Sequence, residues 1–557
     1  MSDINEYVVT LKKGQDCDCF YDDMETPGGT DCIPDRAVEC ANRRPISRNT
    51  HYWLTAAEAE ALQNDPRVAA VTMGDIGRYG VEPVWEQTGT FSKTSTDNTN
   101  DLNWGVLRCI DGVQIPGWGT DGTPDQTGTA QYNAAGLNVD VVIIDGFMDP
   151  THPEFAVNSD GTGGTRVNQF NWFSLNSYLG RPAQSPYVYT PVVDPGNAQR
   201  TTDNNHGCNV AGIACGSNYG WARSSNIYNI NPYGTDPNNM DFFLLWDYVR
   251  AFHATKPINP AINQRNPTIC NCSYGQFVRW PNTATVPAFG PVTLARWGGV
   301  TSINSSGLSN DTLLDRSIYA VGGVATTNYY NPAIEADVQD ALDDGIVVVG
   351  AAGNLNTVIL LPTDPNYDGL LGNRINATYG GTNYYWDISK GTTPGSVPGV
   401  ICVGSVGTAS QEYKSSFSNN GPGIDVFAPG SDIMSSVNSP GSFGGIPDPV
   451  NPSYWITKLS GTSMSSPQVC GILACLMQSN LNLTATQAKQ WIDYYSTKSQ
   501  MTDTGGEQRD PTALRGAPNQ YLFAKKLRPD DGNTFPVSNY FVRPTSGSVW
   551  PRPQIRR

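Results

Sequence analysis

The sequence has no apolar run long enough to cross a membrane. A transmembrane helix needs about 18–20 consecutive apolar residues, and the longest candidate, GIVVVGAAG from Gly345, has the length of a buried strand. The first residues, MSDINEYVVTLKKGQDCDC, lack the apolar stretch of about 7–15 residues that a secretion signal contains. We therefore expect no membrane partner and no conventional export route.

Basic residues are scarce. The 557 residues include 35 Lys and Arg against 51 Asp and Glu, which gives a formal charge of -16 and an isoelectric point near 4.7. Such a chain repels phosphate backbones, so nucleic acid is not an expected partner. The hydrophobic fraction of 38% is ample for a buried core, and the length suits two or three domains.

The twelve cysteines fall into two groups. Cys17, Cys19, Cys32 and Cys40 crowd the N-terminal segment, where the Cys-x-Cys spacing is poor for zinc and leaves either two disulfides or four free thiols. Others lie among apolar or small residues and are expected to act as small buried hydrophobes in a reducing cytosol. These are Cys208, Cys215, Cys270, Cys272, Cys402, Cys470 and Cys475.

Residues 1–75 are typical of a small α+β domain. YVVTLK predicts a strand, LTAAEAEALQN a helix and RVAAVT a second strand. Thr55 and Glu58 have the spacing of a capping box at the start of the helix, and Asp65-Pro66 predicts its end. Residues 76–100 lack periodicity and are rich in Gly, Ser, Thr and Asn, so we interpret them as a linker.

From about residue 101 to 520, short apolar runs alternate with helical patterns. VDVVIID, TICNCSYG, IVVVGAAGN and VICVGSV are typical of buried strands. This alternation predicts an α/β fold with a parallel sheet covered by helices on both faces. Catalytic groups in such folds gather at the carboxyl ends of the strands, where Asp145 and Asn354 are expected.

Four segments carry residues with the chemistry of a serine hydrolase. VVIIDGFMDPTHPEF holds Asp145, NNHGCNVAG holds His206, VVVGAAGN ends in Asn354, and GTSMSSP holds Ser463. Taken singly, an Asp after a strand is more often a helix cap, and a Gly-Thr-Ser before a helix is ordinarily an N-cap. The four segments in this order make coincidence improbable.

The segments resemble the motifs of the subtilases over about residues 104–497. HGCNVAG is similar to the family's HGTHVAG, and GTSMSSP is nearly its GTSMASP. NCSYG resembles the strand that lines the substrate cleft, carried by Ser273, Tyr274 and Gly275. The resemblance implies a subtilisin-like fold and a serine endopeptidase that acts on polypeptides through an acyl-enzyme.

Each residue then has an expected role. His206 would take the proton of Ser463 and return it to the leaving amine, while Asp145 orients the imidazole. The amide of Ser463 and the side chain of Asn354 would form the oxyanion hole. Together with the NCSYG strand, Ala352 and Gly353 suggest a broad apolar substrate pocket.

The sequence departs from the family pattern at several positions. Gly146 replaces the usual hydroxyl residue after the catalytic Asp, and Phe147 replaces a glycine, which puts the positioning of the carboxylate in question. Cys208 and Asn209 replace Thr and His of HGTHVAG, so altered packing without loss of catalysis is expected. A shortened stretch after Gly212 removes a common calcium loop. We expect no cofactor or catalytic metal, and structural calcium has no readable site.

The first 75 residues resemble the inhibitory prodomain of subtilases, with a ferredoxin-like fold. This resemblance implies an intramolecular chaperone and inhibitor that is processed within about residues 75–105, so that the chain is a zymogen. The alternative is an accessory domain that is never removed.

Two insertions and a tail extend the expected catalytic domain. The insertions, at about 156–200 and 276–330, are interpreted as long surface loops. Residues 521–557 are Pro-rich, repeat RPDDGNTFP and RPTSGSVWP at a spacing of fifteen residues, and suggest an extended arm laid on another protein. The tail resembles those of phage structural proteins in its general character only. This resemblance predicts a location in the virion or in the host cytoplasm. The alternatives are secretion by another route and an inactive structural or binding component of a phage particle.

Overall fold

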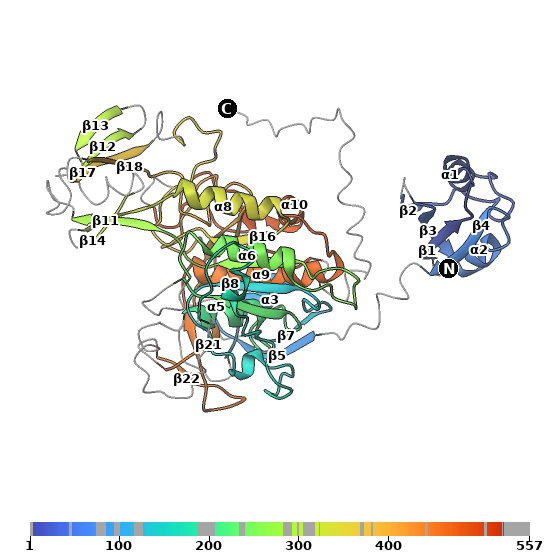
Figure 1. The fold of residues 1–557 in the computed structure, drawn as a ribbon, viewed down its shortest axis with the longest axis horizontal. Coiled ribbons are helices and arrows are strands. Elements are labelled where there is room, and N and C mark those ends of the chain that lie inside the picture. Colours follow the sequence, from blue (N-terminus) through green and yellow to red (C-terminus); the bar gives the residue numbers. More distant parts are fainter. Residues whose placement is uncertain are drawn as a thin grey trace. The chain divides into compact units, whose positions relative to one another are not determined.

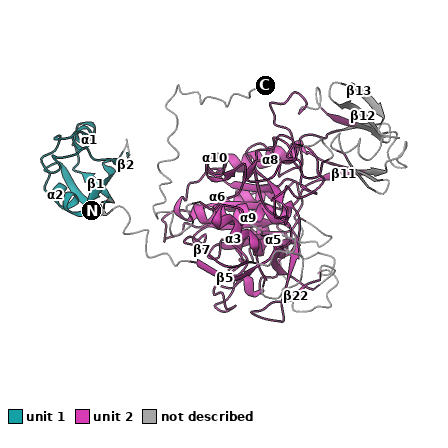
Figure 2. Cartoon of the chain, turned by 180° about the vertical axis from the view of Figure 1, so that it is seen from behind, with its two compact units in different colours: residues 1–83, 534–557 teal, residues 84–533 magenta. Residues whose placement is uncertain are grey.

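The structure is a computed structural model of the chain (Figure 1). The chain divides into two compact units, whose described parts fall within Met1–Pro83 and Val84–Asn533 (Figure 2). The described residues are 4–43, 47–73, 85–93, 101–115, 118, 126–185, 206–232, 240–281, 292–297, 300–304, 318–321, 324–367, 373–379, 382–440, 444–505, 510–525 and 527.

The first unit is a four-stranded antiparallel sheet with two helices. Its strand order is β2-β3-β1-β4, and the predicted strand, helix and strand correspond to β1, α2 and β4. Thr55 and Glu58 form the predicted capping box at the start of α2, whereas α1, β2 and β3 were not predicted. The elements are β1 (Ile4–Leu11), α1 (Cys17–Glu25), β2 (Cys40–Asn42), β3 (Asn49–Thr55), α2 (Ala56–Leu62) and β4 (Val68–Met73).

The second unit is built on an eight-stranded, mostly parallel sheet. The strand order is β24-β25-β20-β19-β16-β10-β8-β9, and only β24 runs antiparallel to its neighbour. Every residue of β8, β10, β16 and β19 is buried, so both faces of the sheet are covered as predicted. The strands are β8 (Asp140–Ile144), β9 (Asn226–Ile230), β10 (Thr268–Cys272), β16 (Val347–Ala351), β19 (Ile401–Val406), β20 (Val426–Pro429), β24 (Thr497–Lys498) and β25 (Gln520–Tyr521).

Two helices of this unit, α5 and α9, begin at or next to the predicted catalytic residues His206 and Ser463. The first, α5, packs on β8 and on α9, and α9 also packs on β10, β16, β19 and β20. Both are almost wholly buried, because their residues are small or apolar on every side. The longer helices are α3 (Trp104–Asp111), α5 (His206–Cys215), α6 (Leu245–Thr255), α8 (Pro332–Asp343), α9 (Thr462–Ser479) and α10 (Ala485–Tyr495). None of the helices in the described part of the chain has the length and apolarity to span a bilayer.

The linker predicted over residues 76–100 is wrong for part of its length. Trp85–Phe91 form β5, which pairs along its whole length with β7 (Gln126–Tyr132) and at its end with β6 (Asp101–Leu102). Phe91, Ser92 and Lys93 are buried. The Lys93 ammonium lies 4.8 Å from the ring centre of Trp104 and 5.4 Å from that of Trp118, and burial lowers its pKa to about 8. This segment is therefore part of the second unit.

The insertion at 276–330 is not simply a loop, because its described residues include five strands. Three of them form the sheet β11-β15-β14, and the other two pair with a second segment in the sheet β13-β12-β17-β18. The strands are β11 (Phe277–Pro281), β12 (Val292–Trp297), β13 (Val300–Asn304), β14 (Tyr319–Val321), β15 (Val324–Asn328), β17 (Arg374–Tyr379) and β18 (Thr382–Asp387).

Smaller elements complete the second unit. The insertion at 156–200 contains one short helix in its described part, and a three-stranded sheet, β21-β23-β22, lies beside α5. These elements are η1 (Pro153–Phe155), η2 (Trp172–Leu175), β21 (Ile433–Val437), β22 (Ile446–Pro447) and β23 (Trp455–Leu459).

The predicted C-terminal arm begins later than residue 521. Tyr521 lies in β25, and Leu522, Ala524 and Leu527 are buried. The carbonyl of Leu527 accepts a hydrogen bond from the amide of Asn133, 2.9 Å away. The second unit thus includes residue 527, and the rest of the predicted arm lies outside the described residues.

The structure describes all twelve cysteines and joins none of them in a disulfide. The seven predicted to be small buried hydrophobes are buried, as is Cys109. In the first unit, Cys17, Cys32 and Cys40 pack against the apolar core, so thiols and not disulfides occupy this region.

Candidate active site

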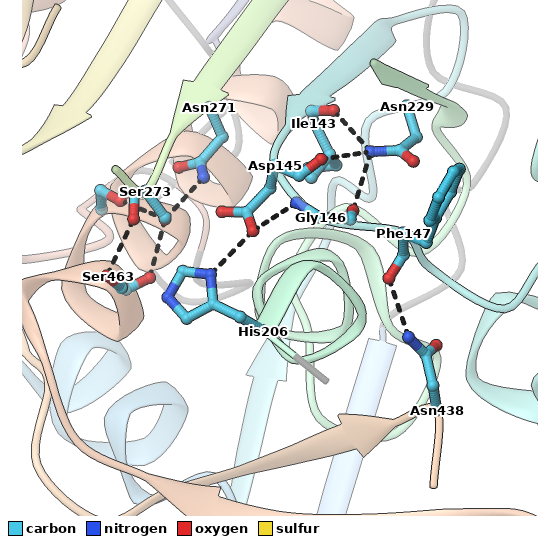
Figure 3. Close-up of polar contacts among 11 residues, drawn as sticks. Ile143, Asp145, Gly146, Phe147, His206, Asn229, Asn271, Ser273, Asn438 and Ser463 are labelled. Carbon is cyan, nitrogen blue, oxygen red and sulfur yellow. Dashed lines mark hydrogen bonds and ion pairs between the residues drawn. The ribbon is translucent and has the colours of Figure 1, made fainter. Parts of the chain in front are cut away.

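The predicted catalytic residues come together at one edge of the parallel sheet. Asp145 directly follows β8, and Asn354 lies three residues beyond β16. His206 is the first residue of α5, and Ser463 is the second residue of α9. Figure 3 shows the imidazole of His206 between the carboxylate of Asp145 and Ser463. The four residues thus lie at strand ends or helix N-termini on the same edge of the sheet.

Asp145 is positioned to orient the imidazole. Its Oδ1 accepts a hydrogen bond from His206 Nδ1 at 2.7 Å and another from the amide of Gly146 at 2.7 Å. The Asp145 side chain is 2% exposed and that of His206 is 30% exposed, so the acid is buried while the ring remains accessible. Because Nδ1 donates to the carboxylate, Nε2 of the neutral ring is left to act as a base.

Two asparagines hold the loop that follows Asp145. Asn229 Nδ2 donates to the carbonyl of Ile143 at 2.9 Å and reaches the carbonyls of Asp145 and Gly146 at 3.4 and 3.3 Å. Asn438 Nδ2 donates to the carbonyl of Phe147 at 2.9 Å. These contacts fix the carboxylate without the hydroxyl residue that Gly146 replaces. The Oδ2 atom of Asp145 is buried and has no hydrogen-bond partner among the described residues.

Close backbone packing explains the glycine after His206. A Cβ atom on Gly207 would lie 2.0 Å from the carbonyl oxygen of Gly146, so a side chain at this position would push α5 away from the Asp145 loop. Helix α5 is held on its other side by Ser435 and Ser436, whose hydroxyls donate to the carbonyls of Asn209 and Cys208. Burial raises the pKa of the Cys208 thiol to about 12, so this thiol is not a nucleophile.

Ser463 projects from the first turn of α9. Its hydroxyl donates to the carbonyl of Ser273, 2.9 Å away, and the side chain is almost buried. The amide groups of a helix N-terminus and the helix dipole favour negative charge at this point. A negative charge that develops next to Ser463 is therefore stabilised by the helix itself.

The hydroxyl of Ser273 supports the helix that carries Ser463. In a regular helix the carbonyl of Ser463 would accept from the amide of residue 467, but Pro467 has no N–H. Ser273 Oγ donates to this carbonyl at 2.8 Å, and it also contacts Ser466 Oγ and Asn271 Nδ2, both at 2.8 Å. The side chain that was predicted to bind substrate thus lies against α9, and Ser273 presents its main chain to the Ser463 hydroxyl.

Asn354 is oriented to place its NH₂ group beside the amide of Ser463. Its Oδ1 accepts from the amide and from the hydroxyl of Thr462, both at 2.9 Å, which leaves Nδ2 as the outward group. A Cβ atom added to Gly461 would lie 3.4 Å from Asn354 Nδ2 and 3.6 Å from the amide nitrogen of Ser463. The two nitrogen atoms therefore both lie near Gly461, and their role as an oxyanion hole stays a prediction.

The other predicted substrate-binding residues surround these groups. Gly353 has φ +103° and donates its amide to Thr462 Oγ1 at 3.1 Å, while Ala352 is fully buried. Tyr274 packs its ring against Phe242 with the centroids 5.5 Å apart. Gly275 bridges to Pro394. Their role in substrate binding stays a prediction.

Charged residues near the site give no metal centre. Among the residues that the structure describes, no three His, Cys, Asp or Glu side chains are grouped to hold an ion. Glu154, on η1, accepts hydrogen bonds from the amides of Asn218 and Tyr219 and closes the turn after α5. The expectation of no cofactor stays a prediction.

Parts of the chain are similar to known proteases. A stretch of 89 residues is 42% identical to "Subtilisin-like protease 1" of Trichophyton rubrum and covers 16% of this chain and 14% of that protein. A stretch of 174 residues is 30% identical to "Alkaline serine exoprotease A" of Vibrio alginolyticus and covers 31% of this chain and 24% of that protein. The matched stretches thus span less than a quarter of the length of these two relatives.

Solved structures give matches of the same kind. A cold adapted subtilisin-like serine proteinase is 21% identical with a TM-score of 0.42, over 76% of this chain and 98% of that chain. A protease of Pseudoalteromonas arctica PAMC 21717 is 18% identical with a TM-score of 0.38, over 69% and 89%. Residues 136–509, well over half of the sequence, match the profile of the Subtilase family. The match includes the segments of Asp145, His206, Asn354 and Ser463, and the chain belongs to the subtilase family.

Proposed function

We propose that this protein is a serine endopeptidase that hydrolyses peptide bonds in polypeptide substrates. The observation that carries the proposal is the arrangement at the sheet edge. Asp145 holds the imidazole of His206 at 2.7 Å, and Ser463 lies beside that ring. The side-chain nitrogen of Asn354 and the amide nitrogen of Ser463 both lie near Gly461. Family membership supports the same chemistry.

In the first half of the reaction, the hydroxyl of Ser463 attacks the carbonyl carbon of the scissile bond. Nε2 of His206 takes the hydroxyl proton, and the carboxylate of Asp145 stabilises the resulting imidazolium. The proton then passes to the leaving amine as the C–N bond breaks, which leaves an acyl group on Ser463. A water molecule, activated by the same ring, hydrolyses this ester.

The oxyanion of each tetrahedral intermediate is assigned to Asn354 Nδ2 and the amide of Ser463. Thr462 fixes the Asn354 amide through Oδ1, so its donor group is already oriented before substrate arrives. Because the carbonyl oxygen acquires full negative charge only in the transition state, these donors act mainly on turnover and little on substrate affinity.

A fluorophosphonate probe tests the proposal, because it reacts with an activated serine and with few others. The wild-type protein should be labelled on Ser463, and the matched variant Ser463→Ala should not. Asp145→Asn, which keeps the size of the side chain, should slow labelling strongly. A wild-type protein that takes up no label after removal of the first unit would favour the alternative, an inactive structural or binding component.

We also propose that the first unit is an inhibitory prodomain, so that the chain is a zymogen. Its α+β organisation supports this role. Because β5 is integral to the second unit, a cut that preserves the catalytic unit falls before Trp85. N-terminal sequencing should give a new N-terminus between about residues 75 and 85 in the wild type, and only Met1 in Ser463→Ala. If neither protein is cut, the unit is a permanent accessory domain.

We further propose that residues 528–557 bind phage structural proteins and that the protease is associated with the virion or the host cytoplasm. The Pro-rich repeats in this tail support the proposal. A variant that ends at residue 527 should keep its activity but lose co-sedimentation with phage particles. Equal co-sedimentation of the two proteins, or none, would count against the proposal.

A further inference from the structure

The oxyanion donor Asn354 lies on a turn that has no regular secondary structure of its own. The turn follows the end of β16 at Ala351 and includes Gly353, whose φ is +103°. Thr462 fixes the side chain of Asn354 and accepts from the amide of Gly353 before it, but no contact of Thr462 holds the main chain after Asn354 among the described residues. Placement of the Nδ2 atom therefore depends on whatever holds the flanking peptide groups.

One side chain binds the turn on both sides of Asn354. Asn419 Nδ2 donates to the carbonyl of Ala352 at 2.7 Å. Asn419 Oδ1 accepts from the amide of Leu355 at 3.1 Å and from the amide and hydroxyl of Thr357, both at 3.0 Å. The main-chain amide of Asn419 donates to the carbonyl of Gly353 at 2.9 Å. The turn is thus wrapped around a single carboxamide.

This position requires both a donor and an acceptor. Asn419 is fully buried, and its Nδ2 points at a carbonyl while its Oδ1 faces three donors. An aspartate would place an oxygen against the carbonyl of Ala352. The contact is also tight, because a Cβ atom on Gly353 would lie 2.6 Å from Asn419 Nδ2.

The segment that carries Asn419 is held independently of its side chain. Lys414 Nζ donates to the carbonyl of Ser418 at 2.7 Å and to Asn356 Oδ1 at 3.1 Å. Asn420 donates through its side chain to Asn356 Oδ1 and through its amide to the carbonyl of Thr357, both at 3.0 Å. A change of the Asn419 carboxamide should therefore leave the two segments paired.

We propose that Asn419 is the positioning residue for the oxyanion donor, and that it sets the turnover rate through Asn354 without touching the substrate. The inference rests on the proposed endopeptidase function. It assigns an effect on turnover to a side chain in the segment SFSNNG.

The test is a double-mutant cycle between Asn419→Asp and Asn354→Ala, read with a fluorogenic peptide that the wild type cleaves. Asn419→Asp should lower kcat by about 10- to 100-fold and change KM by less than about threefold. In the Asn354→Ala background the same change should lower kcat by less than about threefold, because the donor that it positions is already gone. The matched control is Asn176→Asp, another buried amide that donates to a carbonyl, with kcat close to that of the wild type.

Two results would overturn the inference while leaving the proposed function intact. One is a kcat for Asn419→Asp within about twofold of the wild type, and the other is an equal loss in both backgrounds. If Asn419→Asp does not fold, Thr357→Val, which removes one contact to the carboxamide, takes its place in the cycle with an expected loss of about two- to fivefold. A wild-type protein that neither cleaves peptides nor reacts with the probe would refute the proposed function, and this inference with it.

Discussion

Removal of the Ser273 hydroxyl should weaken the start of the helix that carries Ser463. The hydroxyl replaces the amide that Pro467 cannot offer to the carbonyl of Ser463, and it accepts a hydrogen bond from Asn271. In Ser273→Ala the carbonyl, the Asn271 amide and the Ser466 hydroxyl all lose this partner in a buried place. The Ser466 hydroxyl can rotate about its C–O bond, so only the other two groups are counted. No water can easily enter, because Ser273 itself is 2% exposed.

The magnitude follows from the number of groups left without this bond. A buried polar group that loses its partner costs about 1–3 kcal/mol, so the carbonyl of Ser463 and the amide of Asn271 together lower the free energy of unfolding by about 2–6 kcal/mol in Ser273→Ala. Substitution of Pro467 by alanine restores an N–H that can donate to the Ser463 carbonyl. In the Pro467→Ala background, Ser273→Ala should therefore cost about 1–1.5 kcal/mol less than it does alone.

The assay is denaturant unfolding of the larger unit, followed by tryptophan fluorescence, with all variants made in Ser463→Ala so that self-digestion does not interfere. The single variants, the double variant and the parent give the coupling energy directly. A loss below about 0.5 kcal/mol in Ser273→Ala, or a loss that Pro467→Ala does not reduce, would refute the reasoning.

Three further predictions concern other parts of the second unit. Asn354→Ala should lower kcat by about 10²–10³-fold with little change in KM, measured with the peptide assay. Glu412→Gln should destabilise the protein by about 3 kcal/mol in thermal or denaturant unfolding, because Arg108, which is fully buried, bonds to Glu412 at 2.6 and 2.8 Å and would keep an uncompensated charge. For His253, burial and then the Lys256 cation lower the pKa from 6.5 to about 4, so its contribution to stability is present above pH 6.5 and is lost as the pH falls toward 4. His253→Gln should flatten the pH dependence of the unfolding free energy over that window by about 3 kcal/mol, and an unchanged pH profile would contradict this.

The main sheet and the four catalytic segments could be predicted from the sequence for a simple reason. Strands buried on both faces are continuous apolar runs, and those of Val347–Ala351 and Ile401–Val406 stand out from their surroundings. The nucleophile and the base lie in short motifs with fixed local geometry, so their positions could also be predicted. The carboxyl ends of parallel strands lie at one edge of the sheet, so residues that follow different strands are expected to lie close together.

The remaining elements depend on partners far away in the chain. Trp85–Phe91 is polar between its two aromatic ends and includes a glycine, and it becomes a strand because it pairs with residues about forty positions later. Asn229, Asn438 and Asn419 give no local signal, since each acts on main-chain groups of a distant segment. Such contacts are visible only once the fold has brought the segments together.

The position of β5 decides where a recombinant form without the first unit has to begin. A start at about Asn103 would delete β5, the partner strand of β7, and the Lys93 side chain that lies against Trp104 and Trp118. A shortened product that starts at Trp85 keeps the cation in its aromatic surroundings. Expression trials of the two starts should therefore give soluble protein from the longer one.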